Sequence, residues 1–343
     1  MKMTLLGSLI FLFLWLVFRI RGILAPFLLA LVITYVLNPP VEAMVRRRVS
    51  RVWAIIILYA LAGLLLGAAL VFLVPALVTE LTRLGETVPE YTVRLQKLAR
   101  EARQDFTRID LPDSLRQALE QNLADLEGAM VGFIQRVLAA TVGAVGGALS
   151  LLLAPVLAFY LLKDLDYFKG WLVASIPLRW RTETLSLLRE MDRVVAGFIR
   201  GQLILAAIIG FLVAVAMAVL RVKFPLVLGI IAGAAEVIPY FGPIIGALPA
   251  VALALLENPL LAAKVIVSFF LIQQVESSLI APKVVGDTVG LHPVAVIFSL
   301  LVGGELAGVP GLLLAVPVAG VMRVLGSYFW RKLAIETRQE APD

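Results

Sequence analysis

Two glutamates lie inside apolar stretches of this chain, where a charged side chain is costly. Glu236 belongs to the stretch 224–256, and Glu305 belongs to the stretch 292–325. Acidic residues inside apolar membrane segments are rare, and most of them are functional. Because loss of water favours the protonated form of a carboxylic acid, each glutamate is a candidate for binding a proton or a monovalent cation. The alternative for each is an interfacial position with the carboxyl group in water.

Further polar residues lie on a membrane-spanning helix predicted between the two stretches, over 260–281. Gln273 and Glu276 are three positions apart on it and therefore share a helix face. A position in water is again the alternative for Glu276. We predict that these residues form a substrate- or ion-binding site with the two glutamates above and with residues at the breaks of the two stretches: Pro239, Tyr240, Gly242, Pro243, Pro310 and Gly311.

The two stretches follow the same plan. Each opens with a proline, carries its acid eleven or twelve residues later, and has another proline 24 residues after the first. Each is also broken by Pro and Gly, at Tyr240-Phe241-Gly242-Pro243 and at Gly308-Val309-Pro310-Gly311. Interrupted hydrophobic segments in matching positions are typical of the binding site of a secondary transporter.

The lengths of the stretches, 33 and 34 residues, predict re-entrant hairpins. One membrane crossing needs about 20 apolar residues and two need about 40, so neither fits well. A hairpin that dips into the membrane and returns does fit, and its irregular tip is tolerated where it lines a cavity. One spanning helix separates the hairpins, so they should enter from opposite faces as an inverted pair with converging tips. Two kinked transmembrane helices are the alternative.

The composition indicates an all-α, polytopic integral membrane protein. Hydrophobic residues make up 61% of the 343 residues, against about half in soluble domains, and the mean hydropathy is +0.98. The net charge of +6 comes from basic residues at the ends of apolar runs, which is typical of membrane loops rather than of nucleic-acid binding. The chain has no cysteine, and no phosphate-binding loop or nucleophile motif occurs. We therefore expect no enzyme, no metal site and no cofactor beyond a coupling H⁺ or Na⁺.

The chain divides into five predicted regions. They are N-terminal transmembrane helices (1–78), an extramembrane amphipathic helical hairpin (79–136), transmembrane helices with a cytoplasmic amphipathic helix (137–220), a transport core with the two broken hairpins (221–325), and a cytoplasmic tail (326–343).

The N-terminal region contains two short apolar runs, 5–18 and 22–37. They predict two helices in a tight hairpin, or alternatively one long tilted helix, and we expect Asn38-Pro39-Pro40 to end this unit. Arginines then form a short loop, which the positive-inside rule places in the cytoplasm. The same rule gives the basic C-terminal tail a cytoplasmic position.

The region 79–136 is charged yet strongly periodic, with apolar residues three or four positions apart. This pattern predicts two amphipathic helices on either side of Asp110-Leu111-Pro112-Asp113. Their apolar seams either bury each other or contact another subunit or the bilayer surface. The arginine loop places this hairpin on the extracytoplasmic side.

Four segments together resemble the AI-2E (autoinducer-2 exporter) family. They are ALVITYVLNPPVEAMVRR (30–47), EVIPYFGPIIGALPA (236–250), PKVVGDTVGLHP (282–293) and GVPGLLLAVPVAG (308–320). The resemblance covers nearly the whole chain. It implies an inner-membrane exporter of small solutes that forms homo-oligomers, pentamers among them, and it carries over no catalytic residues.

Three functions are compatible with these residues. The first is a proton- or ion-coupled exporter of a small polar solute, similar to autoinducer-2, with Glu236 as the coupling residue. The second is an antiporter that exchanges a monovalent cation such as Na⁺ for protons. The third is a non-transporting membrane scaffold whose helical hairpin docks partners.

Overall fold

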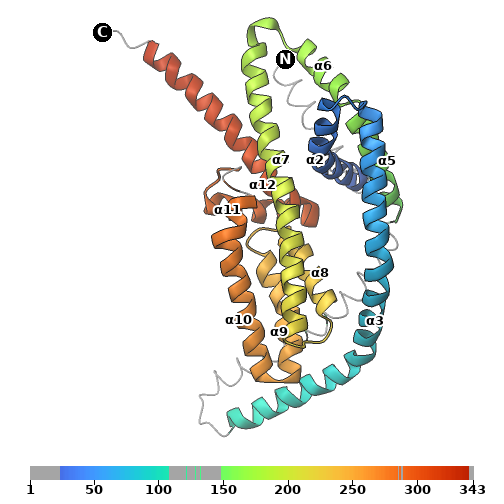
Figure 1. Ribbon diagram of the computed structural model, residues 1–343. Coiled ribbons are helices and arrows are strands. Elements are labelled where there is room, and N and C mark those ends of the chain that lie inside the picture. Colours follow the sequence, from blue (N-terminus) through green and yellow to red (C-terminus); the bar gives the residue numbers. More distant parts are fainter. Residues whose placement is uncertain are drawn as a thin grey trace. The chain divides into compact units, whose positions relative to one another are not determined.

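A computed structural model describes residues 24–107, 121, 128, 132, 148–284, 286 and 289–339 (Figure 1). Every regular element among these residues is helical, as the sequence predicts. The elements are α2 (Leu24–Arg46), α3 (Arg51–Thr107), α5 (Ala148–Lys163), α6 (Leu165–Ser175), α7 (Leu178–Val219), α8 (Pro225–Glu236), α9 (Gly242–Glu257), α10 (Pro259–Val275), a π-helical turn η1 (Glu276–Ile280), α11 (Ala281–Val284) and α12 (Pro293–Gln339).

Five helical segments in the described part of the chain are long and apolar enough to cross a membrane. They are 26–46, 51–80, 178–219, 259–284 and 293–332. Apolar side chains cover their outer surfaces, since Leu64, Phe72, Phe211 and Phe270 are all exposed. In water such surfaces would be unfavourable, whereas lipid chains solvate them. The chain is therefore a multi-pass membrane protein.

The prediction that Asn38-Pro39-Pro40 ends the first unit is wrong. Helix α2 continues through both prolines to Arg46. The side chain of Asn38 donates a hydrogen bond of 3.0 Å to Oε1 of Glu42, which bridges the turn that the prolines weaken. Membrane helices tolerate proline where neighbouring groups satisfy the freed backbone atoms. The predicted helix over 5–18 lies outside the described residues.

Two helices are longer than the sequence pattern indicated. Helix α3 joins the predicted transmembrane region 1–78 to the first amphipathic helix of 79–136 without a break, and its 57 residues measure roughly 85 Å along the helix axis. Helix α7 likewise joins the cytoplasmic amphipathic helix predicted within 137–220 to a transmembrane helix of the same region. The second amphipathic helix of 79–136 lies almost wholly outside the described residues.

The chain forms two compact units. Unit 1 comprises Met1–Leu64, Gly146–Arg200 and Val289–Asp343, and unit 2 comprises Leu65–Val145 and Gly201–Thr288. The first broken stretch thus belongs to unit 2 and the second to unit 1. The convergence of their tips stays a prediction.

Unit 1 is held together where α2, α3 and α5 meet. Val41, Ala54, Ile55 and Leu162 form its buried apolar cluster. The guanidinium of Arg51 donates to the carbonyl oxygen of Leu162, at 2.5 Å, and forms an ion pair of 2.7 Å with Asp166. The arginine therefore satisfies a backbone oxygen at the end of α5, which has no partner within its own helix.

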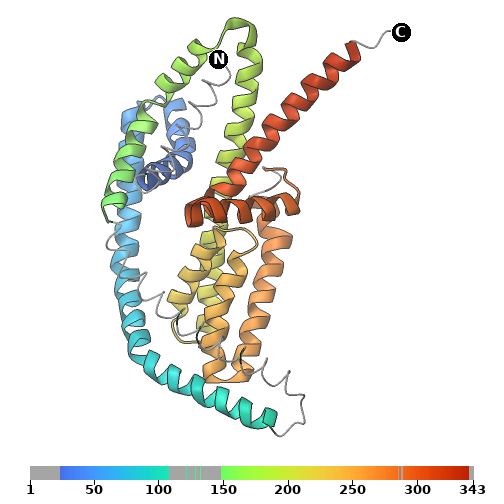
Figure 2. The same ribbon diagram turned by 180° about the vertical axis from the view of Figure 1, so that it is seen from behind.

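Unit 2 is a bundle of α8, α9, α10 and the second half of α7, and α8 and α10 both pack against α9 (Figures 1 and 2). Its core includes Val213, Met217, Leu228 and Val265. Helices α7 and α8 approach so closely that a Cβ atom at Gly233 would lie 2.8 Å from the carbonyl oxygen of Ala206. Small residues permit this contact, as in other membrane helix pairs.

A glutamate from α3 caps the start of α8. The carboxylate of Glu80 accepts hydrogen bonds from the backbone N–H groups of Val227, at 3.0 Å, and Leu226, at 3.4 Å. Phe224, the residue before α8, supplies no side-chain cap of its own. A negative charge at a helix N-terminus is favourable, because it meets unpaired N–H groups and the positive end of the helix dipole.

We expect Glu80→Gln to destabilise the protein by about 1 kcal/mol, since the amide retains one acceptor but loses the charge. The measurement is thermal unfolding of the purified protein in detergent. Glu86→Gln is the matched control, because Glu86 lies on the same helix with an exposed side chain. Equal melting temperatures for the two variants would show that the cap contributes nothing.

Candidate functional site

The first broken stretch is a hairpin of two short helices in unit 2. Helix α8 has 12 residues and α9 has 16, so they extend for about 18 and 24 Å. Both are shorter than the hydrocarbon core of a bilayer, about 30 Å. A Cβ atom at Gly246 would lie 2.9 Å from Cα of Ala232, so the two legs pack backbone against backbone. These dimensions fit the predicted re-entrant hairpin, and its position in a membrane stays a prediction.

The break in this hairpin lies slightly earlier than the sequence indicated. The turn occupies 237–241, with Tyr240 in the left-handed region at φ 64°. Gly242 and Pro243 already belong to the first turn of α9. A proline suits that position, because the first turn of a helix needs no N–H donor from it. Pro239 lies in the turn and is half-buried, whereas the Tyr240 side chain is exposed.

Glu236 is the last residue of α8 and is only 2% exposed. The hairpin closes tightly over it, since a Cβ atom at Gly242 would lie 2.6 Å from Cα of Glu236. Its carboxyl group therefore has no access to water in unit 2. The alternative, an interfacial position with the carboxyl group in water, does not fit this burial.

Glu276 lies beside Glu236 although 40 residues separate them in the chain. It is 8% exposed and begins the π-helical turn η1, and the two carboxyl groups are within hydrogen-bonding reach of each other. The side chain of Gln273 reaches Glu276 in turn. A carboxylate only accepts hydrogen bonds, so a hydrogen bond between two carboxyl groups requires that one of them carries a proton. The structure thus brings together Glu236, Gln273 and Glu276.

Each glutamate keeps one buried oxygen atom free of protein partners. Within the described part of the chain, Oε2 of Glu236 and Oε2 of Glu276 have no hydrogen-bond partner. Buried polar atoms are almost always paired, so such exceptions point to a functional role. A proton, a cation or a polar solute could supply the missing partner.

Gln202 completes this cluster, and the sequence reasoning missed it. Its side chain is buried, and Nε2 donates a hydrogen bond to the backbone carbonyl oxygen of Glu236. This oxygen lies at the C-terminal end of α8, where no N–H of the same helix is available. The signal was present, since Gln202 is a polar residue at the start of an apolar run.

We expect Gln202→Leu to destabilise the protein by about 1–3 kcal/mol, because it leaves a buried carbonyl oxygen without a donor. Thermal unfolding in detergent measures this effect. Gln274→Leu is the control, since Gln274 is exposed and bonds only with nearby serines on its own helix. A Gln202→Leu variant as stable as this control would show that the hydrogen bond is unimportant.

The second broken stretch is also a hairpin, in unit 1. Helix α12 is interrupted at Gly308, whose backbone angles (φ 61°, ψ −137°) are not helical. Gly303 and Gly311 touch backbone to backbone across this break, although eight residues in a straight helix would separate them by about 12 Å. The predicted break at 308–311 is therefore confirmed. Gly311 is buried, whereas Glu305 and Pro310 are exposed, so in unit 1 Glu305 does not share the burial of Glu236.

Comparisons with known proteins agree on one family. A family model described as "AI-2E family transporter" matches residues 6–329, which include every predicted site residue. The protein YrrI of Bacillus subtilis (strain 168) is 32% identical, over 92% of this chain and 89% of its own length. A Haemophilus influenzae (strain Rd) relative is 29% identical, over 88% and 85%. The AI-2 transport protein TqsA of Escherichia coli (strain K12) is 28% identical, over 88% and 85%. All three are named as transport proteins.

Proposed function

Because this chain belongs to the AI-2E transporter family, we propose that it exports a small polar solute and that proton movement at Glu236 and Glu276 drives the export. The observation that supports proton coupling is the contact between two buried carboxyl groups. Each of them has one oxygen atom without a hydrogen-bond partner among the described residues. Intramembrane acids of this kind form the proton relays of many transporters.

The pair works as a proton carrier through its shared proton. With one proton between them, the carboxyl groups hydrogen-bond to each other and the site is compact. When the proton leaves, two buried negative charges repel, and the pair is stable only if water or a polar ligand reaches it. Release of the proton would therefore favour an open state of the hairpin that admits solute.

Two local features would allow the backbone to move at Glu236 and Glu276. Glu236 ends a helix next to the turn 237–241, and Glu276 begins a π-helical turn, a feature common at functional sites. Both backbones are thus irregular where the carboxyl groups meet. Breaks in membrane helices at a binding site are typical of secondary transporters.

The name of one relative supports a solute class for this proposal. The Escherichia coli relative is named for AI-2, a small polyhydroxylated furanone, and hydroxyl groups can donate to the two unpartnered carboxyl oxygens. We therefore extend the proposal to export of AI-2 or a solute of similar size and polarity. It further includes the inner membrane as location, a cytoplasmic C-terminus and a homo-oligomer.

The test is efflux of AI-2 from vesicles that contain the purified protein. We expect a proton gradient directed inward to accelerate efflux several-fold and a protonophore to abolish the acceleration. A sodium gradient should have no effect. Efflux that is the same with and without the proton gradient would contradict proton coupling, and absence of efflux would contradict the solute class.

A second candidate function is exchange of a monovalent cation for protons, with no organic solute. The two unpartnered carboxyl oxygens favour it, since carboxylate oxygens also bind cations. A pH-sensitive dye inside the vesicles distinguishes the two functions. A pH change on adding Na⁺ without any solute would identify the antiporter.

A further inference from the structure

Helix α6 of unit 1 presents an aromatic face that no other described residue covers. None of its residues is buried. Tyr167 and Trp171 are 72% and 62% exposed, and Phe168 and Leu172 are exposed beside them. At 100° per residue these four side chains and Ser175 share one side of the helix. The face is thus continuous.

The opposite side of α6 is attached to its own unit by ion pairs. Asp166 contacts Arg51 at 2.7 Å, and Lys169 contacts Glu42 at 3.9 Å. These contacts fix the helix beside the turn between α2 and α3. They direct its aromatic face away from that turn, because the two sides of the helix point in opposite directions.

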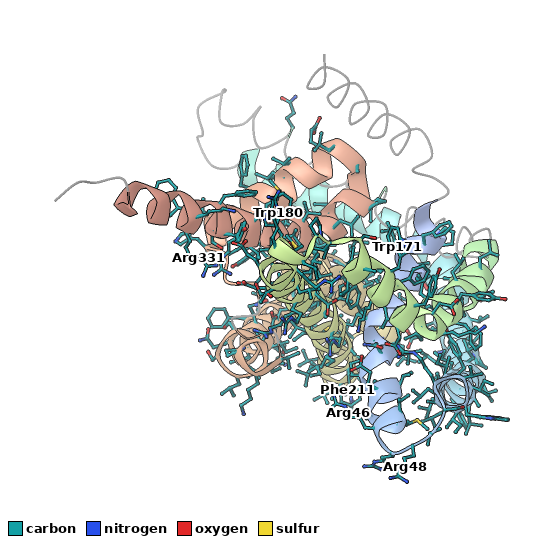
Figure 3. All side chains as sticks on the ribbon, turned by 90° about the horizontal axis from the view of Figure 1, so that it is seen from above. Arg46, Arg48, Trp171, Trp180, Phe211 and Arg331 are labelled. Atoms are coloured by element: carbon teal, nitrogen blue, oxygen red, sulfur yellow. The ribbon has the colours of Figure 1, made fainter. Side chains whose placement is uncertain are left out.

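Basic residues lie before and after α6 in the chain and at the end of α2. Arg46, Arg47 and Arg48 are exposed at the end of α2, four to six residues after Glu42 (Figure 3). Lys163 precedes α6, and Arg179 follows it with its guanidinium 4.0 Å above the centre of the Trp180 ring. The acids Glu42 and Asp166 are already occupied by the ion pairs above. Exposed basic residues therefore lie in the segments next to α6, and those at the end of α2 are on its ion-paired side.

We propose that α6 lies in the membrane interface, with its aromatic face among the lipid chains and the neighbouring arginines on anionic lipid headgroups. Tyr and Trp are enriched at the level of the headgroups, because their rings are apolar and their tips polar. A helix with a charged, polar side and an aromatic side has the pattern of interfacial helices. Arginines near a membrane surface are attracted to anionic lipids.

The experiment uses single-cysteine variants of the full chain, which has no cysteine of its own. Ser175→Cys carries an environment-sensitive fluorophore on the aromatic face. Gly170→Cys carries the same fluorophore on the other side, where a side chain meets no neighbour within 4 Å. Each variant is placed in vesicles of phosphatidylcholine, with or without phosphatidylglycerol, and titrated with a lipid-borne quencher or with iodide.

We expect the lipid-borne quencher to reduce the Ser175→Cys signal several-fold more than the Gly170→Cys signal. Phosphatidylglycerol should increase this difference, and replacement of Arg46, Arg47 and Arg48 by glutamine should remove the increase. Iodide quenching of both variants alike would overturn the proposal. A Ser175→Cys signal protected from both quenchers would also overturn it, since a second protein copy would then cover the face. Equal quenching in the two lipids would overturn the anionic assignment.

Discussion

Replacement of Glu236 by glutamine should abolish proton-coupled export. Glutamine has nearly the same shape and still bonds with Glu276, but it cannot release a proton. We expect efflux from vesicles to lose its response to the proton gradient, with at least a tenfold lower rate under an inward gradient. A tenfold change corresponds to about 1.4 kcal/mol, which is modest for the loss of a buried ionisable group.

Glu257→Gln is the matched control for this variant. Glu257 ends the other leg of the same hairpin and pairs with Lys223 at 3.5 Å, away from the turn 237–241. It should keep the gradient response of the original protein. If Glu236→Gln keeps that response as well, the coupling site lies elsewhere, whatever solute is transported.

The second large effect is expected for Gly242→Ala. A Cβ atom there would lie 2.6 Å from Cα of Glu236 and 2.7 Å from the carbonyl oxygen of Ala235. These are backbone atoms, so the hairpin itself must open to make room. Overpacking of this kind costs about 1–3 kcal/mol, and here it also displaces the glutamate. We expect a lower melting temperature in detergent together with loss of coupled efflux.

Gly67→Ala tests whether the effect is specific. Gly67 lies on α3 with no neighbour within 4 Å of a new methyl group. Alanine should there be neutral or slightly stabilising, because it favours the helical conformation. If both substitutions have the same small effect, the tight closure of the hairpin does not hold Glu236 in place.

The sequence predicted what depends on local pattern. Apolar runs predicted the membrane-spanning segments. The Gly308-Val309-Pro310-Gly311 segment predicted the second break, since glycine readily leaves the helical conformation. The grouping of Gln273 with Glu276 followed from helical spacing. These features need no knowledge of distant parts of the chain.

What the sequence did not predict depends on contacts between distant segments. The continuation of α2 through Pro39 and Pro40 is a matter of packing and side-chain bonds, which override the usual effect of proline. The roles of Gln202 and Glu80 depend on helix ends that are remote in the chain. The contact between Glu236 and Glu276 likewise requires the fold of unit 2. Glu305 matches Glu236 in the sequence pattern, but the match did not predict its burial. Among the described residues of unit 1 no side chain covers Glu305, so it is exposed.

The contact between Glu80 on α3 and the start of α8 has a consequence for how movement reaches Glu236. Pro89 lies between Glu80 and Thr107 and weakens the helix there, so a displacement near Thr107 reaches Glu80 only in part. Glu80 holds the first N–H groups of α8, and Glu236 is the last residue of that same short rod. A movement of α3 at Glu80 would therefore be passed along α8 to Glu236 at its other end. We expect efflux to change when an antibody binds near Thr107, and two glycines inserted after Glu86 should remove that change.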